Sequence, residues 1–262
     1  MKGDPLEVLD SSPRFQVADE EYVRLLGYPR GHDLTDRPKE LMEGARAWYR
    51  ENGRPWIYLR KVERLEWENG RLEVESVEFS SRRVQRTLSH AKASGAFVVA
   101  VSAGRECEET ARRLWEEEKP DEYFFLEVFG SAVVESLVAA ASFRMCEWAD
   151  QRGLVVLPHD SPGYPGWNIG EQERLFGLIR ARPRGGALPV EVLESGMLKP
   201  KKSLLALFGV AVPSDATTSA AQSIPCERCT LAECQYRRVQ YRGKFPQLED
   251  ASNIRQSQPS SK

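Results

Sequence analysis

The hydrophobic pattern changes period several times along the first third of the chain. Two early segments repeat apolar side chains every three or four positions, and the second ends at Gly53, as amphipathic helices do. Apolar and polar residues then alternate on either side of Asn69-Gly70, a dipeptide typical of a two-residue hairpin turn. The expected elements are helices at 20–28 and 37–52 and antiparallel strands near 56–67 and 71–79.

Short apolar runs and helical periods alternate over the rest of the chain up to residue 212. The run AFVVAV is entirely apolar, which indicates a buried strand, and Ser80 or Ser81 can cap the helix before it. This order predicts the α+β class, with a mixed or antiparallel sheet and helices packed on it. The expected elements are helices at 82–95, 106–118, 127–151 and 170–181 and strands at 96–101, 154–158 and 203–212.

Composition and charge narrow the range of partners. Lys and Arg (37) nearly cancel Asp and Glu (39), so the formal charge is −2 and no basic excess indicates nucleic-acid binding. The N-terminus lacks the apolar block of a secretory signal, and the longest apolar run, around Glu135, is too short to span a bilayer. We therefore expect a cytoplasmic protein without a nucleic-acid or membrane partner.

The composition changes again after Pro213. The segments that follow are polar and low in complexity, so they cannot bury enough apolar surface to offset the entropy of ordering. The sequence thus predicts a globular domain over 1–212, a linker over 213–225, a cysteine-rich segment over 226–246 and a disordered end over 247–262.

Three cysteines lie close together in this tail. Cys226, Cys229 and Cys234 have C-x2-C-x4-C spacing, which can surround one soft metal ion. Zinc and iron–sulfur sites normally take four protein ligands, so a fourth would come from another side chain or from a partner. A zinc or iron–sulfur site is one interpretation, and reduced thiols or a redox-sensing pair are the others.

The long helix predicted near 127–151 carries two contrasting stripes. One stripe consists of a carboxylate and small residues, namely Glu135, Ala139, Ser142 and Cys146. The stripe beside it is bulky and consists of Val134, Val138, Ala141, Met145 and Trp148. Either another backbone packs on the small residues, or a ligand lies along them and Glu135 binds its cationic or hydroxyl groups.

The segment HDSPGYPGWN, residues 159–168, cannot form a helix or a regular strand. Gly163 and Gly166 permit backbone angles closed to other residues, and the two prolines stiffen the segment. Such a loop suits the wall of a small-molecule site, with Tyr164 and Trp167 stacking on a planar ligand. The alternative is that both rings plug the core beneath a tight turn.

These segments together resemble a known family. The pieces GSAVVESLVAAA, SPGYPGW and LESGMLKPKKSLLALFGV are similar to the activation domain of cobalamin-dependent methionine synthase, in particular to its free-standing members. The resemblance covers residues 95–212 and extends more weakly from Gly27. It implies a twisted, largely antiparallel sheet flanked by helices, and S-adenosylmethionine as the ligand.

The resemblance also carries binding residues over by position. It implies that Glu135 contacts the ligand and that the backbone of Gly163 and Tyr164 lines the site. Glu194 and Ser195 match a paired element before the last strand. The expected cofactor-binding residues are Glu135, His159, Ser161, Pro162, Gly163, Tyr164, Gly166, Trp167, Glu194 and Ser195.

The chain departs from the family pattern in three ways. His159 stands where the synthase has an arginine that contacts the ligand carboxylate, and its charge depends on pH. Asp160 beside it could repel that carboxylate. The family's N-terminal aspartate motif has no counterpart in this sequence. No catalytic residue is predicted.

The family's activity is a rescue reaction, in which cob(II)alamin is reduced by one electron and methylated by S-adenosylmethionine. The resemblance implies that a partner methyltransferase, such as methionine synthase, supplies the cobalamin and that flavodoxin or a ferredoxin donates the electron. The chain would then be an accessory component rather than a complete enzyme. The alternatives are a metal-binding adaptor that uses the cysteine cluster, and an unrelated small-molecule enzyme for which the sequence offers no nucleophile.

Overall fold

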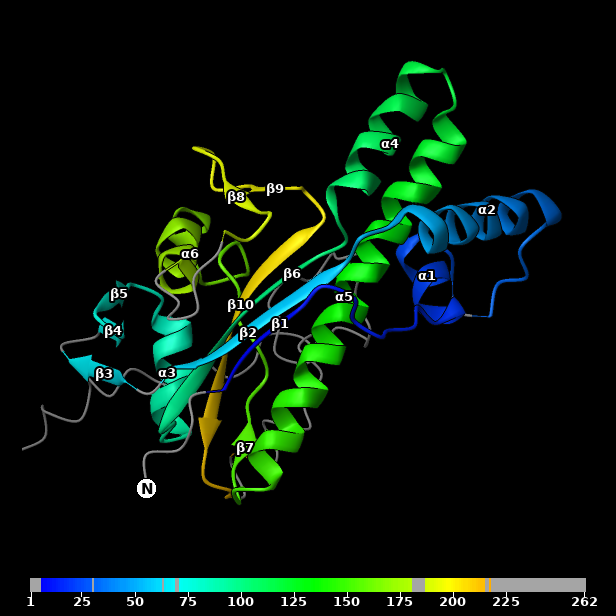
Figure 1. Ribbon diagram of the computed structural model, residues 1–262. Helices are drawn as coiled ribbons and strands as arrows, with labels where there is room; N and C mark the ends of the chain where they lie inside the picture. The colour runs from blue at the N-terminus through cyan, green and yellow to red at the C-terminus, as the bar shows by residue number, and fades with distance from the viewer. Residues whose placement is uncertain are drawn as a thin grey trace, which may run out of the picture.

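The computed structural model describes residues 6–29, 31–62, 64–68, 71–180, 187–214 and 217. At its centre is a five-stranded antiparallel sheet with the strand order β1-β2-β6-β10-β7 (Figure 1). The strands are β1 (Glu7–Asp10), β2 (Trp56–Val62), β6 (Gly95–Ser102), β10 (Ser203–Ala211) and β7 (Val155–Val156). The expected α+β class with a largely antiparallel sheet is therefore confirmed.

One face of the sheet is covered by helices. The longest, α5, packs directly on the strands, with Leu137 and Met145 in the same core as Phe97 and Phe208. α4 runs beside α5, and α1 and α2 pack against the N-terminal part of α5 (Figure 1). The helices of this layer are α1 (Asp19–Leu25), α2 (Asp36–Asn52), α4 (Arg105–Glu116) and α5 (Pro120–Asp150).

The opposite face carries a second core beneath smaller elements. Successive strand residues point to opposite faces, so Val98 and Leu207 belong to this second core while their neighbours Phe97 and Phe208 belong to the first. Burial on both faces explains why β6 is apolar throughout. The covering elements are α3 (Arg82–His90), η1 (Ile169–Glu171), α6 (Gln172–Arg180), the sheet of β3 (Leu65–Glu68), β4 (Arg71–Val74) and β5 (Val77–Phe79), and the hairpin of β8 (Glu191–Val192) and β9 (Leu198–Lys199).

The predicted hairpin near 56–79 divides into more elements than its alternation suggested. The strand expected over 56–67 separates into β2, which joins the large sheet, and β3, which pairs with β4 in the small sheet. The strand expected over 71–79 turns back at Glu75 and Ser76, whose φ angles are 47° and 74°, and so forms the β4–β5 hairpin. A turn inside an alternating run preserves the alternation, so the hydrophobic pattern does not reveal it.

The long helix also differs from its predicted extent. α5 begins at Pro120, seven residues before the predicted start, and proline is well suited to the first turn of a helix. By length and composition α5 could cross a membrane, and within the described part of the chain no other helix could. Its apolar side chains instead form the core against the sheet, because Leu126, Val133, Leu137 and Ala141 are buried there.

Candidate functional site

The loop after β7 runs along the outer edge of β10. β7 is only two residues long and pairs with the last residues of β10. Beyond it, Asp160 and Leu207 exchange two backbone hydrogen bonds of 3.0 and 2.9 Å, and the Ser161 hydroxyl donates to the Leu205 carbonyl at 2.5 Å. These contacts attach the start of the loop to the sheet edge and bury Ser161.

His159 and Asp160 point to opposite faces of the sheet. The His159 ring lies 5.2 Å from the Phe208 ring, on the α5 side, and its Nε2 is 3.1 Å from the Tyr164 hydroxyl. Asp160 turns the other way and forms an ion pair with Arg83 of α3, at 3.0 Å between Oδ1 and Nε. Burial raises the pKa of Asp160, although Arg83 opposes that shift. The expectation that Asp160 could repel a ligand bound beside His159 is corrected by this geometry.

The middle of the loop closes on itself in a tight turn. The Gly163 N–H donates to the Trp167 carbonyl at 2.9 Å, and the Trp167 N–H donates to the Tyr164 carbonyl at the same distance. Gly163 has a φ of +94°, a conformation that residues with a side chain rarely adopt. The predicted rigid turn is therefore present, with glycine at the position that requires it.

The two aromatic rings of the loop have different surroundings. Trp167 is 3 % exposed, packs edge-on against Phe79 and donates from Nε1 to Glu171 at 2.8 Å. The sequence allowed this ring either to stack on a ligand or to fill the core, and the structure places it in the core. Pro162 is also buried. Tyr164 is half-buried, with its hydroxyl at His159. Tyr164 is thus the ring of this loop that a ligand could reach.

The turn between β8 and β9 lies next to this loop. Ile169 is the point of contact, because its Cδ1 and Cγ1 would each lie 3.0 Å from a Cβ placed on Gly163 and on Gly196, respectively. Glu194 and Ser195 occupy the exposed part of that turn. Ile169, Leu193 and Met197 are also solvent-exposed, so the junction of loop and turn is partly apolar. The fold therefore brings together two segments that are 30 residues apart in the sequence.

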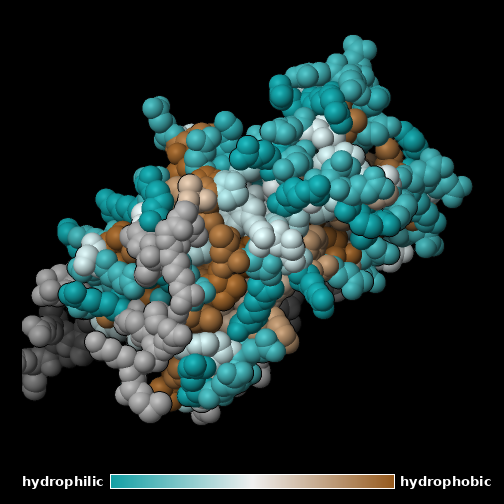
Figure 2. Space-filling model, viewed as in Figure 1, coloured by the Kyte–Doolittle hydropathy of each residue, from teal (hydrophilic) through white to brown (hydrophobic). Residues whose placement is uncertain are grey.

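Glu135 lies on the face of the sheet to which His159 points. It is half-buried on α5 and follows Val134, which shares its core with Phe208. One turn earlier, the Ser131 hydroxyl accepts a hydrogen bond of 2.9 Å from Lys202, the residue before β10. Figure 2 shows hydrophobic surface beside α5. Glu135 and His159 therefore lie on the same face of the sheet, which α5 covers.

The two stripes of α5 differ in burial. The bulky residues Val134, Val138 and Met145 are buried against the sheet. On the small-residue stripe, Ala139 is exposed, and Ser142 and Cys146 are half-buried. The small residues thus lie at the margin of the core.

The metal prediction falls outside the described part of the chain, because Cys226, Cys229 and Cys234 lie beyond residue 217. Within the described ranges, no group of three or more His, Cys, Asp or Glu side chains is arranged to hold a metal ion. Cys107 is a buried thiol whose pKa is raised by burial to about 12, and Cys146 is half-buried.

A separate cleft of about 950 Å³ lies between the α4–α5 pair and the β8–β9 hairpin. Trp115 and Tyr123 stand on one wall, and the cleft also contains both basic and acidic side chains. Its lining residues are Arg105, Glu108, Glu109, Arg112, Trp115, Tyr123, Leu188, Pro189, Val190, Glu191, Lys199, Pro200 and Lys201. None of the residues predicted to bind the cofactor is among them.

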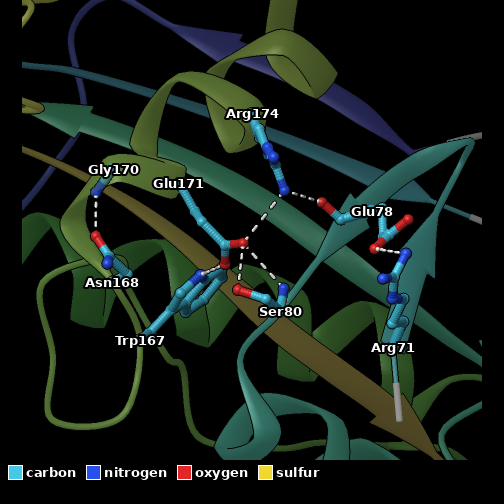
Figure 3. Close-up of polar contacts among 8 residues, drawn as sticks. All are labelled: Arg71, Glu78, Ser80, Trp167, Asn168, Gly170, Glu171 and Arg174. Atoms are coloured by element: carbon cyan, nitrogen blue, oxygen red, sulfur yellow. Dashed lines mark hydrogen bonds and ion pairs between the residues drawn. The ribbon is translucent and has the colours of Figure 1, made fainter. Parts of the chain in front are cut away.

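The sequence interpretation missed the residues that hold the loop from behind. Glu171 is buried beneath it and binds Ser80 and Trp167, as Figure 3 shows. Ser81 was expected as a helix cap, and its hydroxyl does accept from the Val84 N–H, but it also donates to the loop. A hydroxyl or carboxylate in a polar stretch carries no local sign of such distant partners.

No protein-family model matches the sequence. No curated protein matches it either. Among solved structures, the chain is similar to a crystal structure of the MetH reactivation domain bound to AdoHcy. The TM-score is 0.57 at 14 % sequence identity, and the match covers 84 % of this chain and 80 % of that one. The chain therefore shares the fold of that domain.

Proposed function

We propose that this protein binds S-adenosylmethionine and serves as a reactivation module for a corrinoid-dependent methyltransferase such as methionine synthase. The observation that supports this most is the meeting of two segments at the edge of β10. Gly163 and Tyr164, and the turn with Glu194 and Ser195, are the segments that the resemblance assigns to the ligand, and they lie on either side of Ile169. The structurally similar MetH domain is bound to AdoHcy.

The residues assigned to this site offer groups that match those of the ligand. Tyr164 offers a half-buried ring to a planar base, and the Gly163 turn lets a ligand approach the backbone closely. Glu135, on the helix that covers the same face of the sheet, supplies a carboxylate for cationic or hydroxyl groups. His159, at the position that the resemblance matches to an arginine, supplies a ring N–H for the ligand carboxylate.

The role of this chain in the reaction is to bind and orient the methyl donor. The partner's cobalamin would accept one electron and then the sulfonium methyl group. S-adenosylhomocysteine would be the other product. Holding the sulfonium methyl toward the partner in a near-attack geometry lowers the entropic part of the barrier. The electron would come from flavodoxin or a ferredoxin. We assign no catalytic residue to this chain, which acts as an accessory component in the cytoplasm.

The proposed module corresponds to the predicted domain over 1–212. Its last strand, β10, ends at Ala211, next to that boundary. The linker, the cysteine-rich segment and the C-terminal end remain predictions, because nearly all of their residues lie outside the described ranges.

Calorimetric titration with S-adenosylmethionine tests this proposal. We expect the wild-type protein to bind and Glu135→Ala to bind about 10-fold more weakly, since a charge-assisted contact contributes on the order of 1.5 kcal/mol. Glu147→Ala is the matched control, because Glu147 is an exposed carboxylate of the same helix. Absence of wild-type binding at millimolar ligand would contradict the proposed function.

A further inference from the structure

Glu171 is a buried carboxylate directly beneath the loop. It is 6 % exposed, and its two oxygens have different partners. Oε2 accepts the Trp167 Nε1–H at 2.8 Å, while Oε1 accepts the Ser80 N–H at 2.9 Å and the Ser80 hydroxyl at 2.8 Å (Figure 3). Arg174 Nη1 lies 3.4 Å from Oε1 and donates to the Glu78 carbonyl. Glu171 therefore links the loop to the end of β5.

Burying a carboxylate here costs hydration free energy, which an apolar side chain would not lose. A buried charge is tolerated only when hydrogen bonds and opposite charges replace its hydration, and Glu171 has both. An apolar residue would fill the space but would leave the Trp167 N–H without an acceptor. A carboxylate oxygen accepts the indole N–H from one direction, and this favours one orientation of the Trp167 ring.

The backbone of the same residue, Trp167, closes the turn that carries Gly163 and Tyr164. The backbone of Trp167 accepts from the Gly163 N–H and donates to the Tyr164 carbonyl, both at 2.9 Å. These are the two residues whose backbone the resemblance assigns to the ligand. A continuous series of hydrogen bonds thus runs from Glu171 through Trp167 to Gly163 and Tyr164.

The beginning of α3 holds the same loop at two further points. The Ser81 hydroxyl donates to the Gly166 carbonyl at 2.8 Å, and Arg83 Nη1 donates to the Pro165 carbonyl at 3.0 Å. A Cβ added to Gly166 would lie 3.2 Å from the Arg83 Cβ, so loop and helix are in close contact. Glu171 completes this attachment on the Trp167 side.

We propose that Glu171 is a positioning residue, which holds the Gly163–Tyr164 turn in its ligand-binding shape through Trp167. This inference rests on the proposed function, since it concerns the same site. Glu171 itself is covered by the loop and does not touch the ligand. Its contribution is to affinity: a turn that is held in shape before binding loses less conformational entropy when the ligand arrives.

Binding measurements on four proteins test the positioning role. We expect Glu171→Gln and Trp167→Phe each to bind S-adenosylmethionine about 10-fold more weakly, equivalent to about 1.4 kcal/mol. Trp167→Phe keeps an aromatic ring beside Phe79 and removes the donor. Glutamine has a single acceptor oxygen and so cannot accept from both Trp167 and Ser80. The double variant should bind no more weakly than either single variant, because both changes act through the same Glu171–Trp167 contact. Glu173→Gln, a change to an exposed carboxylate on α6, should bind like the wild type.

A loss of stability alone must be separated from a loss of positioning. Titrations are therefore made at a temperature at which circular dichroism shows every variant folded. Ile179→Val removes a methyl group from the same buried core and serves as the stability control. If Glu171→Gln and Ile179→Val lower the melting temperature but both leave the affinity unchanged, the positioning role is overturned.

Hydrogen exchange without ligand distinguishes this inference from the proposed function. The amides of Gly163 and Trp167 are hydrogen-bonded within the loop, so they should exchange slowly in the wild type. We expect them to exchange at least 10-fold faster in Glu171→Gln, with the amides of β6 unchanged. If the wild type does not bind S-adenosylmethionine, the proposed function fails, and this exchange result alone decides the role of Glu171. Unchanged exchange at Gly163 and Trp167 would overturn that role.

Discussion

At the scale of single residues, the most informative position is His159. The synthase has a permanently charged arginine at the matching position, whereas this chain has an imidazole between the Phe208 ring and the Tyr164 hydroxyl. A tilted contact with the Phe208 ring and the contact with Tyr164 hold the imidazole at the edge of the loop. A ligand carboxylate there would meet an imidazole, which lacks the paired N–H donors of a guanidinium.

Replacing His159 with arginine should therefore raise the affinity for S-adenosylmethionine. We expect His159→Arg to bind about 5- to 10-fold tighter, because a guanidinium stays charged and can donate two parallel hydrogen bonds to a carboxylate. Calorimetric titration of the wild type and the variant provides the measurement, and His90→Gln, a change on the exposed side of α3, is the control. Unchanged or weaker affinity in His159→Arg would exclude this role.

The surroundings of the two aromatic residues of the loop could not be predicted from the residues themselves. The sequence placed Tyr164 and Trp167 equally well in a ligand site or in the core. Trp167 is in the core because its indole N–H finds a buried acceptor in Glu171. Glu171 is only four residues from Trp167, but its other partner is Ser80 at the end of β5, 91 residues away. The sequence around Trp167 therefore does not show that this carboxylate is buried.

At the scale of elements, α5 and α4 are in unusually close contact at one glycine. A Cβ on Gly130 of α5 would lie 2.8 Å from the Cys107 Sγ of α4, closer than such atoms approach. Lys202 also passes this point, with its Cγ 3.1 Å from the same position. Gly130 thus allows the two helices and the start of β10 to meet.

Gly130→Ala should destabilise the fold despite alanine's higher helix propensity. Overpacking costs about 1–3 kcal/mol, against a gain of roughly 1 kcal/mol from helix propensity. Cys107→Ala removes the clashing sulfur, so the double variant should regain most of the loss that Gly130→Ala causes. Urea denaturation of the wild type, both single variants and the double variant measures this coupling. Strictly additive effects would show that the Cys107 contact is not the cause.

Element order and type could largely be predicted from the sequence, but pairing could not. The buried strand β6 and the last strand β10 lie where periodicity placed them. The Ser81-capped helix α3 begins at Arg82 as expected but ends at His90, five residues before its predicted end. β2 and β3 were expected as one strand, because alternation looks the same on either side of a bend. Their separate sheets are decided by which partners each strand meets, and those contacts are distant in the sequence.

At the scale of the whole molecule, the core beneath α5 contains three groups that must stay protonated. Burial raises the pKa of Cys107 from 9.0 to about 12, and it also raises the pKa of Tyr22 and Tyr49 above their ordinary value of 10.0. Both tyrosine hydroxyls donate to backbone carbonyls, Tyr22 to Phe125 at 2.7 Å and Tyr49 to Ala103 at 2.6 Å. Ionisation of these groups is therefore unfavourable in the folded state.

Stability should fall at alkaline pH for this reason. A pKa raised in the folded state contributes stability that is fully present below the unfolded value and is lost as pH rises toward the folded value. The free energy of unfolding should thus be constant up to about pH 9 and decrease above it, first through Cys107 and then through the tyrosines. Urea denaturation at pH 8, 9 and 10 measures the decrease, and Cys107→Ala should delay its onset. A flat profile to pH 10 in the wild type would contradict the prediction.

The sequence alone determined the order of most elements, the α+β class and the two segments that resemble ligand-binding motifs, because each depends on residues within a few positions of one another. Tertiary structure decided which of those residues meet. It paired Asp160 with Arg83, joined Glu171 to Ser80 beneath Trp167 and brought the Gly163 loop to the Gly196 turn across Ile169. The physical reason is that a buried polar group or a tight backbone contact requires a partner, and the chain supplies that partner from a distant segment that only folding brings near.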